Sequence, residues 1–257
     1  MVSDVHGNAE ALARAGDGAD ALLVLGDLID FVDYHDHGGG ILGAVFGAAT
    51  VAEFARLRRE RPADLPTFAR ALWSGLGDPG RVIEDAVREQ YGKLFAAMTA
   101  PTYATPGNVD VPDLWPEFAR EGIQVLDGEV VELGGLRFGF VGGALLAPGT
   151  APRRGGVFRP YLRTEADFTE GVARLSDVDV VCSHIPPDLP ELTYDVVARR
   201  SEFGSAALLD LIVKQQPRWA VFGHVHQPLA LRTRVSRTEC ANVGHFQRTE
   251  RPYVLRW

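Results

Sequence analysis

Residues 21–27 read ALLVLGD, a short apolar run that ends in Gly26-Asp27. A continuous apolar run of this length is typical of a strand buried on both faces, as the strands of parallel sheets are. The runs 179–183 and 219–222 also indicate buried strands, and residues 102–105 indicate a further short strand. Polar residues follow each of the three closely. Ligand sites of open α/β sheets lie where the strands end. These four runs therefore predict both an α/β fold and the place of its functional site.

The segments between these runs alternate between helix and strand patterns. We expect helices from Asn8, a good N-cap, to about Arg14 and over residues 44–61, 81–98, 165–175 and 202–215. The dipeptides Asp127-Gly128 and Gly134-Gly135 predict hairpins that join strands at 124–127, 130–133 and 137–141. We expect a loop over residues 142–163 and a β-meander over 229–257. This order predicts one α/β domain, residues 1–257, with two packed sheets and helices outside.

Composition narrows the class of protein. The chain has 257 residues, with 26 Lys and Arg against 34 Asp and Glu and a net charge of −8. This balance argues against nucleic acid as the main partner. The sequence has no apolar stretch of the roughly 18 residues that a membrane span needs, so no membrane partner is expected. Its start lacks a signal-peptide pattern, and Cys182 and Cys240 are too few for a secreted disulfide framework, so we expect a cytoplasmic location.

Seven polar side chains closely follow the predicted strands. They are Asp4, His6, Asp27, Asn108, His184, His224 and His226. Oxygen and nitrogen donors without a thiolate suit divalent Mn, Fe, Zn, Co or Ni. Seven donors exceed the four of one tetrahedral zinc site. They fit two cations that share a bridging carboxylate and clamp a phosphoryl group between them.

These residues form motifs that resemble the signature blocks of the calcineurin-like metallophosphoesterase family: Asp4-x-His6, Gly26-Asp27, Gly107-Asn108, His184 and Gly223-His224-x-His226. The resemblance implies a four-layer α/β/β/α sandwich of two packed mixed sheets flanked by helices. It also implies a binuclear metal centre, in which one cation would be held by Asp4, His6 and His226 and the other by Asn108, His184 and His224, with Asp27 bridging both. The implied reaction is in-line attack of a metal-bridging hydroxide on a phosphoester, with Asp27, Asn108 and His224 as catalytic residues.

One position departs from the family pattern. Many relatives carry Gly-Asn-His-Asp, whose His is thought to protonate the leaving group, and here Val109 takes its place. Because valine cannot donate a proton and an alkoxide leaves poorly without one, we expect a phosphodiesterase whose leaving group is already stabilised. A replacement donor is the alternative, and the candidates are His35, His37 and His245. Arginine pairs well with phosphate oxygens, so Arg153, Arg154 and Arg159 are candidate substrate contacts.

Residues 31–100 form a segment longer than a simple βα connection needs, and they begin beside Asp27. We expect a helical insert that caps the site and shapes substrate access. A peripheral packing element and a dimer surface are the alternatives, so a homo-oligomer is possible. Only Met1, Val2 and Ser3 precede Asp4, where a strand usually has about five residues. We expect either a very short first strand or a natural chain that begins further upstream.

The expected substrate is a small phosphoester, a nucleotide or another diester. Phosphomonoesterase and nucleotide pyrophosphohydrolase activities are alternatives within the same family. Two further alternatives are a nuclease, against which the charge of −8 argues, and a catalytically idle metal-binding module. The branch of serine/threonine protein phosphatases carries an arginine in the block after Asp27 and a Glu two residues after the Asn of the third block. Residues 28–32 contain no arginine and Asp110 replaces the Glu, which argues against that activity.

Overall fold

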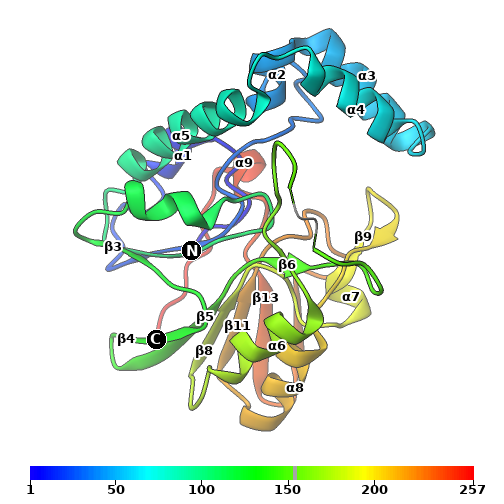
Figure 1. The fold of residues 1–257 in the computed structure, drawn as a ribbon. Coiled ribbons are helices and arrows are strands. Elements are labelled where there is room, and N and C mark those ends of the chain that lie inside the picture. The colour runs from blue at the N-terminus through cyan, green and yellow to red at the C-terminus, as the bar shows by residue number, and fades with distance from the viewer. Residues whose placement is uncertain (153–154) are drawn as a thin grey trace.

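The computed structural model describes residues 1–152 and 155–257, and two sheets occupy its centre (Figure 1). The smaller sheet has the order β1-β2-β3, with parallel pairing throughout, and comprises Leu22–Leu25, Thr102–Thr105 and Ile123–Val125. The larger sheet has the order β12-β13-β11-β8-β5-β4, and its strands are Arg232–Val235, Thr238–Asn242, Trp219–Phe222, Val180–Ser183, Leu136–Val141 and Glu129–Leu133. Strands β5, β8, β11 and β13 run parallel, and β4 and β12 pair antiparallel at the two edges. The predicted strands at 21–25, 102–105, 179–183 and 219–222 are confirmed within one residue at either end.

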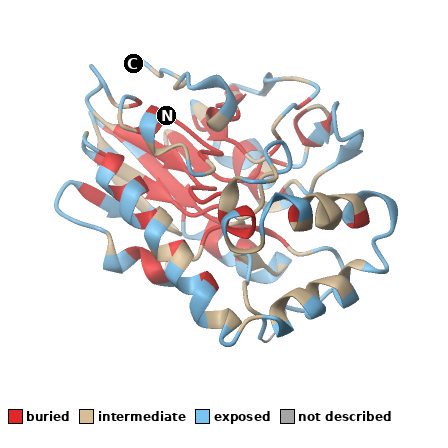
Figure 2. Cartoon of the chain, turned by 90° about the horizontal axis from the view of Figure 1, so that it is seen from above, coloured by how far each residue is buried: buried red, intermediate tan, exposed pale blue. Residues whose placement is uncertain are grey.

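Alternating side chains explain why these strands are apolar on both faces. In β1, Leu23 and Leu25 share one buried cluster with Phe138 of the larger sheet, whereas Leu22 and Val24 belong to the core beneath the neighbouring helices. Strand side chains alternate between the two faces of a sheet, so each such strand buries one row of residues against the other sheet and one row against helices. Figure 2 shows these buried residues concentrated in the central strands.

Helices cover the outer face of each sheet and complete the predicted four layers. On the smaller sheet lie α1 (Ala9–Leu12), which Asn8 caps as predicted, and α5 (Pro79–Ala97). On the larger sheet lie α6 (Glu165–Ala173) and α8 (Ala206–Gln215), which are capped by Thr164 and Ser205. The α/β/β/α sandwich is confirmed, with the refinement that the larger sheet is mixed and the smaller sheet is parallel.

The segment between β1 and β2 carries α2 (Gly40–Phe46), α3 (Ala48–Glu60) and α4 (Leu65–Ser74) ahead of α5. One continuous helix over 44–61 was expected, and this is wrong. Gly47 has φ 79°, a conformation open to glycine that ends α2 and starts α3 in a new direction. Helices α3 and α4 extend away from the two sheets in Figure 1.

Three predictions in the second half of the chain need correction. The Asp127-Gly128 hairpin is wrong, because β3 pairs with β2 in the smaller sheet while β4 begins the larger one. The loop over 142–163 contains a short parallel pair, β6 (Ala144–Leu145) with β7 (Leu162–Arg163). The predicted meander ends at β13. Beyond it lies α9 (Phe246–Thr249), and Tyr253 exchanges two backbone hydrogen bonds of 2.8 Å with Met1 instead of extending a sheet.

The remaining elements are short. They are a 3₁₀ helix at Pro112–Glu117, α7 (Pro190–Thr193) and the antiparallel pair of β9 (Tyr194–Asp195) with β10 (Arg200–Ser201). The very short first strand is reduced to one parallel bridge between Val2 and Val24. In the described part of the chain, no helix combines the length and apolar character needed to cross a membrane.

Candidate metal centre

Loops at the ends of the central strands bring the candidate ligands together through unusual backbone conformations. Asp4, His6, Asp27 and His224 have φ values of 57°, 41°, 53° and 67°. These values lie in the left-handed region, which costs a residue with a side chain of the order of 1 kcal/mol or more and which clusters at functional sites. Four strained residues among the seven candidates are a signal of function independent of their chemistry.

The first group of donors surrounds Asp4. His226 Nε2 lies 3.2 Å from Asp4 Oδ1, and His6 Nε2 lies 3.9 Å from the same oxygen. His6 Nε2 also lies 4.0 Å from Asp27 Oδ2. Asp4, His6 and Asp27 each offer a ligand atom within 4.8 Å of the other two. This group could hold one cation.

The second group of donors surrounds the other oxygen of Asp27. His184 Nε2 lies 3.4 Å from Asp27 Oδ1 and 3.0 Å from Asn108 Oδ1. His224 joins them, since Asp27, His184 and His224 offer ligand atoms within 4.8 Å of one another. Asp27 is therefore common to both groups, with one carboxylate oxygen turned toward each.

Backbone groups fix the orientation of the donors from behind. His6 Nδ1 lies 3.2 Å from Ile29 O, and His184 Nδ1 lies 2.8 Å from Leu25 O, so each ring turns Nε2 toward the carboxylates. The amide of Val109 donates to Asp27 Oδ1 at 2.9 Å, and that of His224 donates to Asp4 Oδ2 at 2.9 Å. Such outer hydrogen bonds are the usual support of metal-binding side chains.

The electrostatics of the centre favour two ionised carboxylates. Burial opposes ionisation, but the hydrogen bond and charge of His226 hold the pKa of Asp4 well below its ordinary value. Burial also tends to raise the pKa of Asp27, but the charge and hydrogen bond of His184 lower it below its ordinary value. Burial tends to lower the pKa of His184, but the charge and hydrogen bond of Asp27 have the larger effect and raise this pKa to about 9. A cation bound here would displace that proton, so metal binding and protonation compete at this centre.

The residues present fit divalent cations. His6 Nε2 is buried without a hydrogen-bond partner among the described residues, and it faces two carboxylates. Burial lowers the pKa of His6, and burial together with His184 lowers that of His224 to about 4, so both rings present a free lone pair at neutral pH. Such an orphaned nitrogen costs free energy in a folded protein, and a cation would satisfy it.

Two supporting residues were missed in the sequence. Asp110 accepts hydrogen bonds from Gly107 N (2.8 Å), Leu28 N (3.0 Å) and the Tyr91 hydroxyl (3.2 Å), and thereby ties together the loops that carry Asp27 and Asn108. Burial and the charge of Asp27 raise the pKa of Asp110 to about 6. The motif around Asn108 contains Asp110 and could have revealed it, but Tyr91 comes from α5 and has no local signal.

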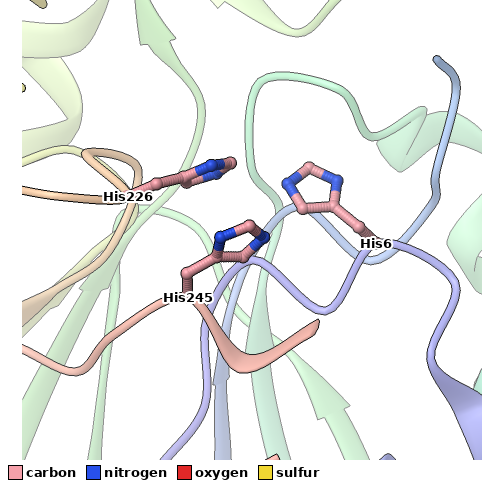
Figure 3. A group of neighbouring side chains, drawn as sticks. All are labelled: His6, His226 and His245. Atoms are coloured by element: carbon pink, nitrogen blue, oxygen red, sulfur yellow. The ribbon is translucent and has the colours of Figure 1, made fainter. Parts of the chain in front are cut away.

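The candidate residues for substrate contact lie at different places in the structure. His245 lies with His6 and His226 in one histidine cluster (Figure 3). His35 lines a cavity of about 500 Å³ together with Asp33, Asp36, Gln247 and Arg248. His37 belongs to none of the groups of potential metal ligands found among the described residues, and Arg159 is exposed. Arg153 and Arg154 lie outside the described residues.

Asp30 leads to a prediction about stability. Burial, with Asp33 and Asp36 nearby, raises the pKa of this carboxyl from 3.8 to about 7, and the residue is 7% exposed. A carboxyl whose pKa is raised by folding stabilises the protein below its unfolded pKa, and the stability is lost as the pH rises through 7. At pH 8 the free energy of unfolding of Asp30→Asn is therefore expected to exceed that of the parent by up to about 4 kcal/mol, since one pKa unit corresponds to ~1.4 kcal/mol.

Denaturant unfolding of the metal-free protein at pH 4.5, 6 and 8 would measure this effect. The stability difference between variant and parent should grow with pH. The exposed Asp17→Asn serves as the matched control, with a constant difference near zero. Parallel pH curves for Asp30→Asn and the parent would contradict the raised pKa.

Comparisons with known proteins agree with this geometry. The calcineurin-like phosphoesterase family model matches residues 1–228 of the chain. One crystal structure is similar with a TM-score of 0.60 and 18% identity, covering 96% of this chain and 90% of that chain. The crystal structure of TT1561 from Thermus thermophilus is similar with a TM-score of 0.52 and 15% identity, covering 96% and 88%. At these identities the likeness concerns the fold. No curated protein matches the sequence.

Proposed function

The chain belongs to the calcineurin-like phosphoesterase family, a family of metal-dependent phosphoesterases, and from this premise we propose that it hydrolyses small phosphodiesters with two divalent cations. The observation that carries the proposal is the position of Asp27, whose two carboxylate oxygens face two separate groups of donors. A carboxylate placed in this way is suited to bridge a pair of cations. Mn, Fe, Zn, Co and Ni all suit the donor types present.

The ligands divide between the two groups. We assign Asp4, His6 and His226 to one cation and Asn108, His184 and His224 to the other, with Asp27 common to both. When bound, the cations would supply positive charge for a phosphoryl group and would acidify water. Asp27, Asn108 and His224 are the residues that we place nearest the reacting phosphorus.

Residue 109 helps to orient the centre but supplies no proton for the leaving group. The backbone of Val109 holds Asp27, while its side chain packs against the core and carries no proton to donate. A leaving group with a low pKa needs little protonation, so an aryl diester suits this centre better than an alkyl ester. We therefore retain the preference for a phosphodiesterase.

The surroundings of the centre suggest how a substrate enters. The cavity beside His35 adjoins Gln247, whose amide donates to the backbone oxygen of His6. Phe31, at the start of the helical segment 31–100, stacks on Phe158, which lies ahead of β7, with a centroid distance of 3.7 Å. We propose that this stack forms one wall of the entrance and that the segment 31–100 acts as its cap within a single domain. A cytoplasmic location and a homo-oligomer remain predictions.

An assay with added Mn²⁺ tests the proposed function. The protein is expected to hydrolyse a bis-aryl phosphate. It should hydrolyse a dialkyl phosphate, from which only an alkoxide can leave, at least about 10²-fold more slowly, because Val109 supplies no acid. A mono-aryl phosphate should be the poorer of the two aryl substrates. A chelator should abolish turnover, and dialysis against Mn²⁺ should restore it.

The variant Val109→His serves as the matched probe of the missing acid. It should narrow the gap between aryl and alkyl leaving groups and leave the aryl rate nearly unchanged. Faster turnover of the monoester would point to a phosphomonoesterase, and cleavage of single-stranded nucleic acid would point to a nuclease. If no divalent metal supports hydrolysis of any phosphoester, the protein is an idle metal-binding module and the proposal is wrong.

A further inference from the structure

His245 lies in the metal centre although it belongs to none of the five motifs. It is 5% exposed and directly precedes α9, after the last strand of the larger sheet. Its ring stacks on that of His226, with centroids 3.7 Å apart and 23° between the planes, and meets His6 edge-on at 5.7 Å. The three rings point toward one another in Figure 3, and their ligand atoms lie within 4.8 Å of one another.

A chain of hydrogen bonds fixes which nitrogen of His245 carries the proton. The backbone oxygen of His6 can only accept, so the Gln247 group that lies 3.1 Å from it must be the NH₂ group. The other end of that amide, Oε1, is therefore an acceptor, and it lies 3.2 Å from His245 Nε2. His245 Nε2 must be the donor, which leaves a lone pair on Nδ1.

That lone pair has no use within the described protein. His245 Nδ1 is buried and lacks a hydrogen-bond partner among the described residues, as does His6 Nε2. The arrangement repeats that of His6 and His184, in which an oxygen holds one ring nitrogen and the other nitrogen faces the centre.

We propose that His245 is an additional ligand, through Nδ1, to the cation that Asp4, His6, Asp27 and His226 would hold. The inference rests on the proposed function and adds a third imidazole to one side of the centre. Imidazole nitrogen favours Fe, Co, Ni and Zn over Mn, whose preferred donors are oxygens. This side of the centre is thereby the nitrogen-rich one, and it should discriminate more strongly between metals than the side formed by Asn108, His184 and His224.

The test compares metal binding by the full-length protein and by His245→Phe, which keeps a ring to stack on His226 but has no nitrogen. Titration of the metal-free proteins with Co²⁺ would be followed by calorimetry and by visible absorption, which reports the ligands and coordination number of this metal. For one of two sites, His245→Phe should bind Co²⁺ about 10- to 100-fold more weakly. Its absorption spectrum should change, and its affinity for Mn²⁺ should fall less.

Two further variants separate ligation from packing. His245→Asn places an oxygen near the position of Nδ1 and should recover part of the Co²⁺ affinity. Thr249 is exposed on α9, and Thr249→Ala should bind Co²⁺ like the parent. The midpoint temperature of thermal unfolding would be measured for each protein without metal and with Co²⁺. If His245 is a ligand, its replacement reduces the rise in midpoint that Co²⁺ produces. If His245 only packs, its replacement lowers the midpoint of the metal-free protein and leaves that rise unchanged.

The outcomes are distinct. Weaker Co²⁺ binding with a changed spectrum in His245→Phe, and partial recovery in His245→Asn, support the inference. If His245→Phe and the parent bind Co²⁺ with the same affinity and the same spectrum, His245 is no ligand, and the proposed function stands without it. If the parent itself binds no Co²⁺, Mn²⁺ or Zn²⁺, the proposed function fails and the inference fails with it.

Discussion

Replacing Asp27 with asparagine is expected to lower the rate of phosphodiester hydrolysis at least about 10³-fold, the scale of loss seen when a central catalytic residue is removed. The substitution keeps the volume of the side chain, and the new Oδ1 can still accept the hydrogen bond from Val109 N. It removes the negative charge that faces both His6 and His184. A neutral amide binds a cation far more weakly than a carboxylate does, so both proposed cations should be lost together.

Metal content after equilibrium dialysis and the turnover of a bis-aryl phosphate would measure these effects. Asp20→Asn, on an exposed turn ahead of β1, makes the same chemical change at the surface and should retain activity and metal. Circular dichroism would establish that each variant is folded. Asp27→Asn with parental turnover, or with one of two metals still bound at full affinity, would show that this carboxylate does not bridge the centre.

Gly107→Ala is expected to cost at least about 3 kcal/mol of stability, the upper range for overpacking of a well-packed site. The loops that end β1 and β2 approach so closely that a Cβ at residue 107 would overlap the backbone nitrogen and the carboxylate of Asp27. A Cβ at Gly26 would overlap the backbone of Gly107 in turn. Relief would require the two loops to separate, and Asp27 would then move away from Asn108.

Gly77→Ala provides the matched control, since residue 77 lies between α4 and α5 and an added Cβ meets open space there. Denaturant unfolding of both variants in the metal-free state would give the difference in stability. Gly107→Ala should also lose metal affinity, whereas Gly77→Ala should keep the parental values. A stable Gly107→Ala protein with normal metal binding would mean that the loops can separate without harm to the centre.

The central strands and their ligands could be predicted because each has a strong local signal. A short apolar run followed by Asp27 or Asn108 is visible in the sequence without knowledge of the neighbouring strands. The structure brings all seven proposed ligands to one edge, because parallel strands end on the same side of a sheet.

The misplaced elements share a non-local cause. Asp127-Gly128 has the local signature of a hairpin, but the Asp127 carboxylate accepts from Gly142 N at 2.9 Å and from the Tyr161 hydroxyl at 2.6 Å. Because of these contacts with residues distant in sequence, the dipeptide connects a strand of the smaller sheet to a strand of the larger sheet. The run that begins at Tyr253 likewise has the pattern of a strand, yet the backbone hydrogen bonds of Tyr253 go to Met1 at the other end of the sequence.

The centre draws on residues from Asp4 to His226, which sets the order of events during synthesis of the protein. On the ribosome, Asp4, His6 and Asp27 emerge early, but the loops after β8 and β11 emerge near the end. A cation therefore has an incomplete set of donors while most of the nascent chain is being made, and cannot template the early steps. If the centre binds cations as proposed, the sheets would assemble from their apolar runs first and metal uptake would be the last event in maturation.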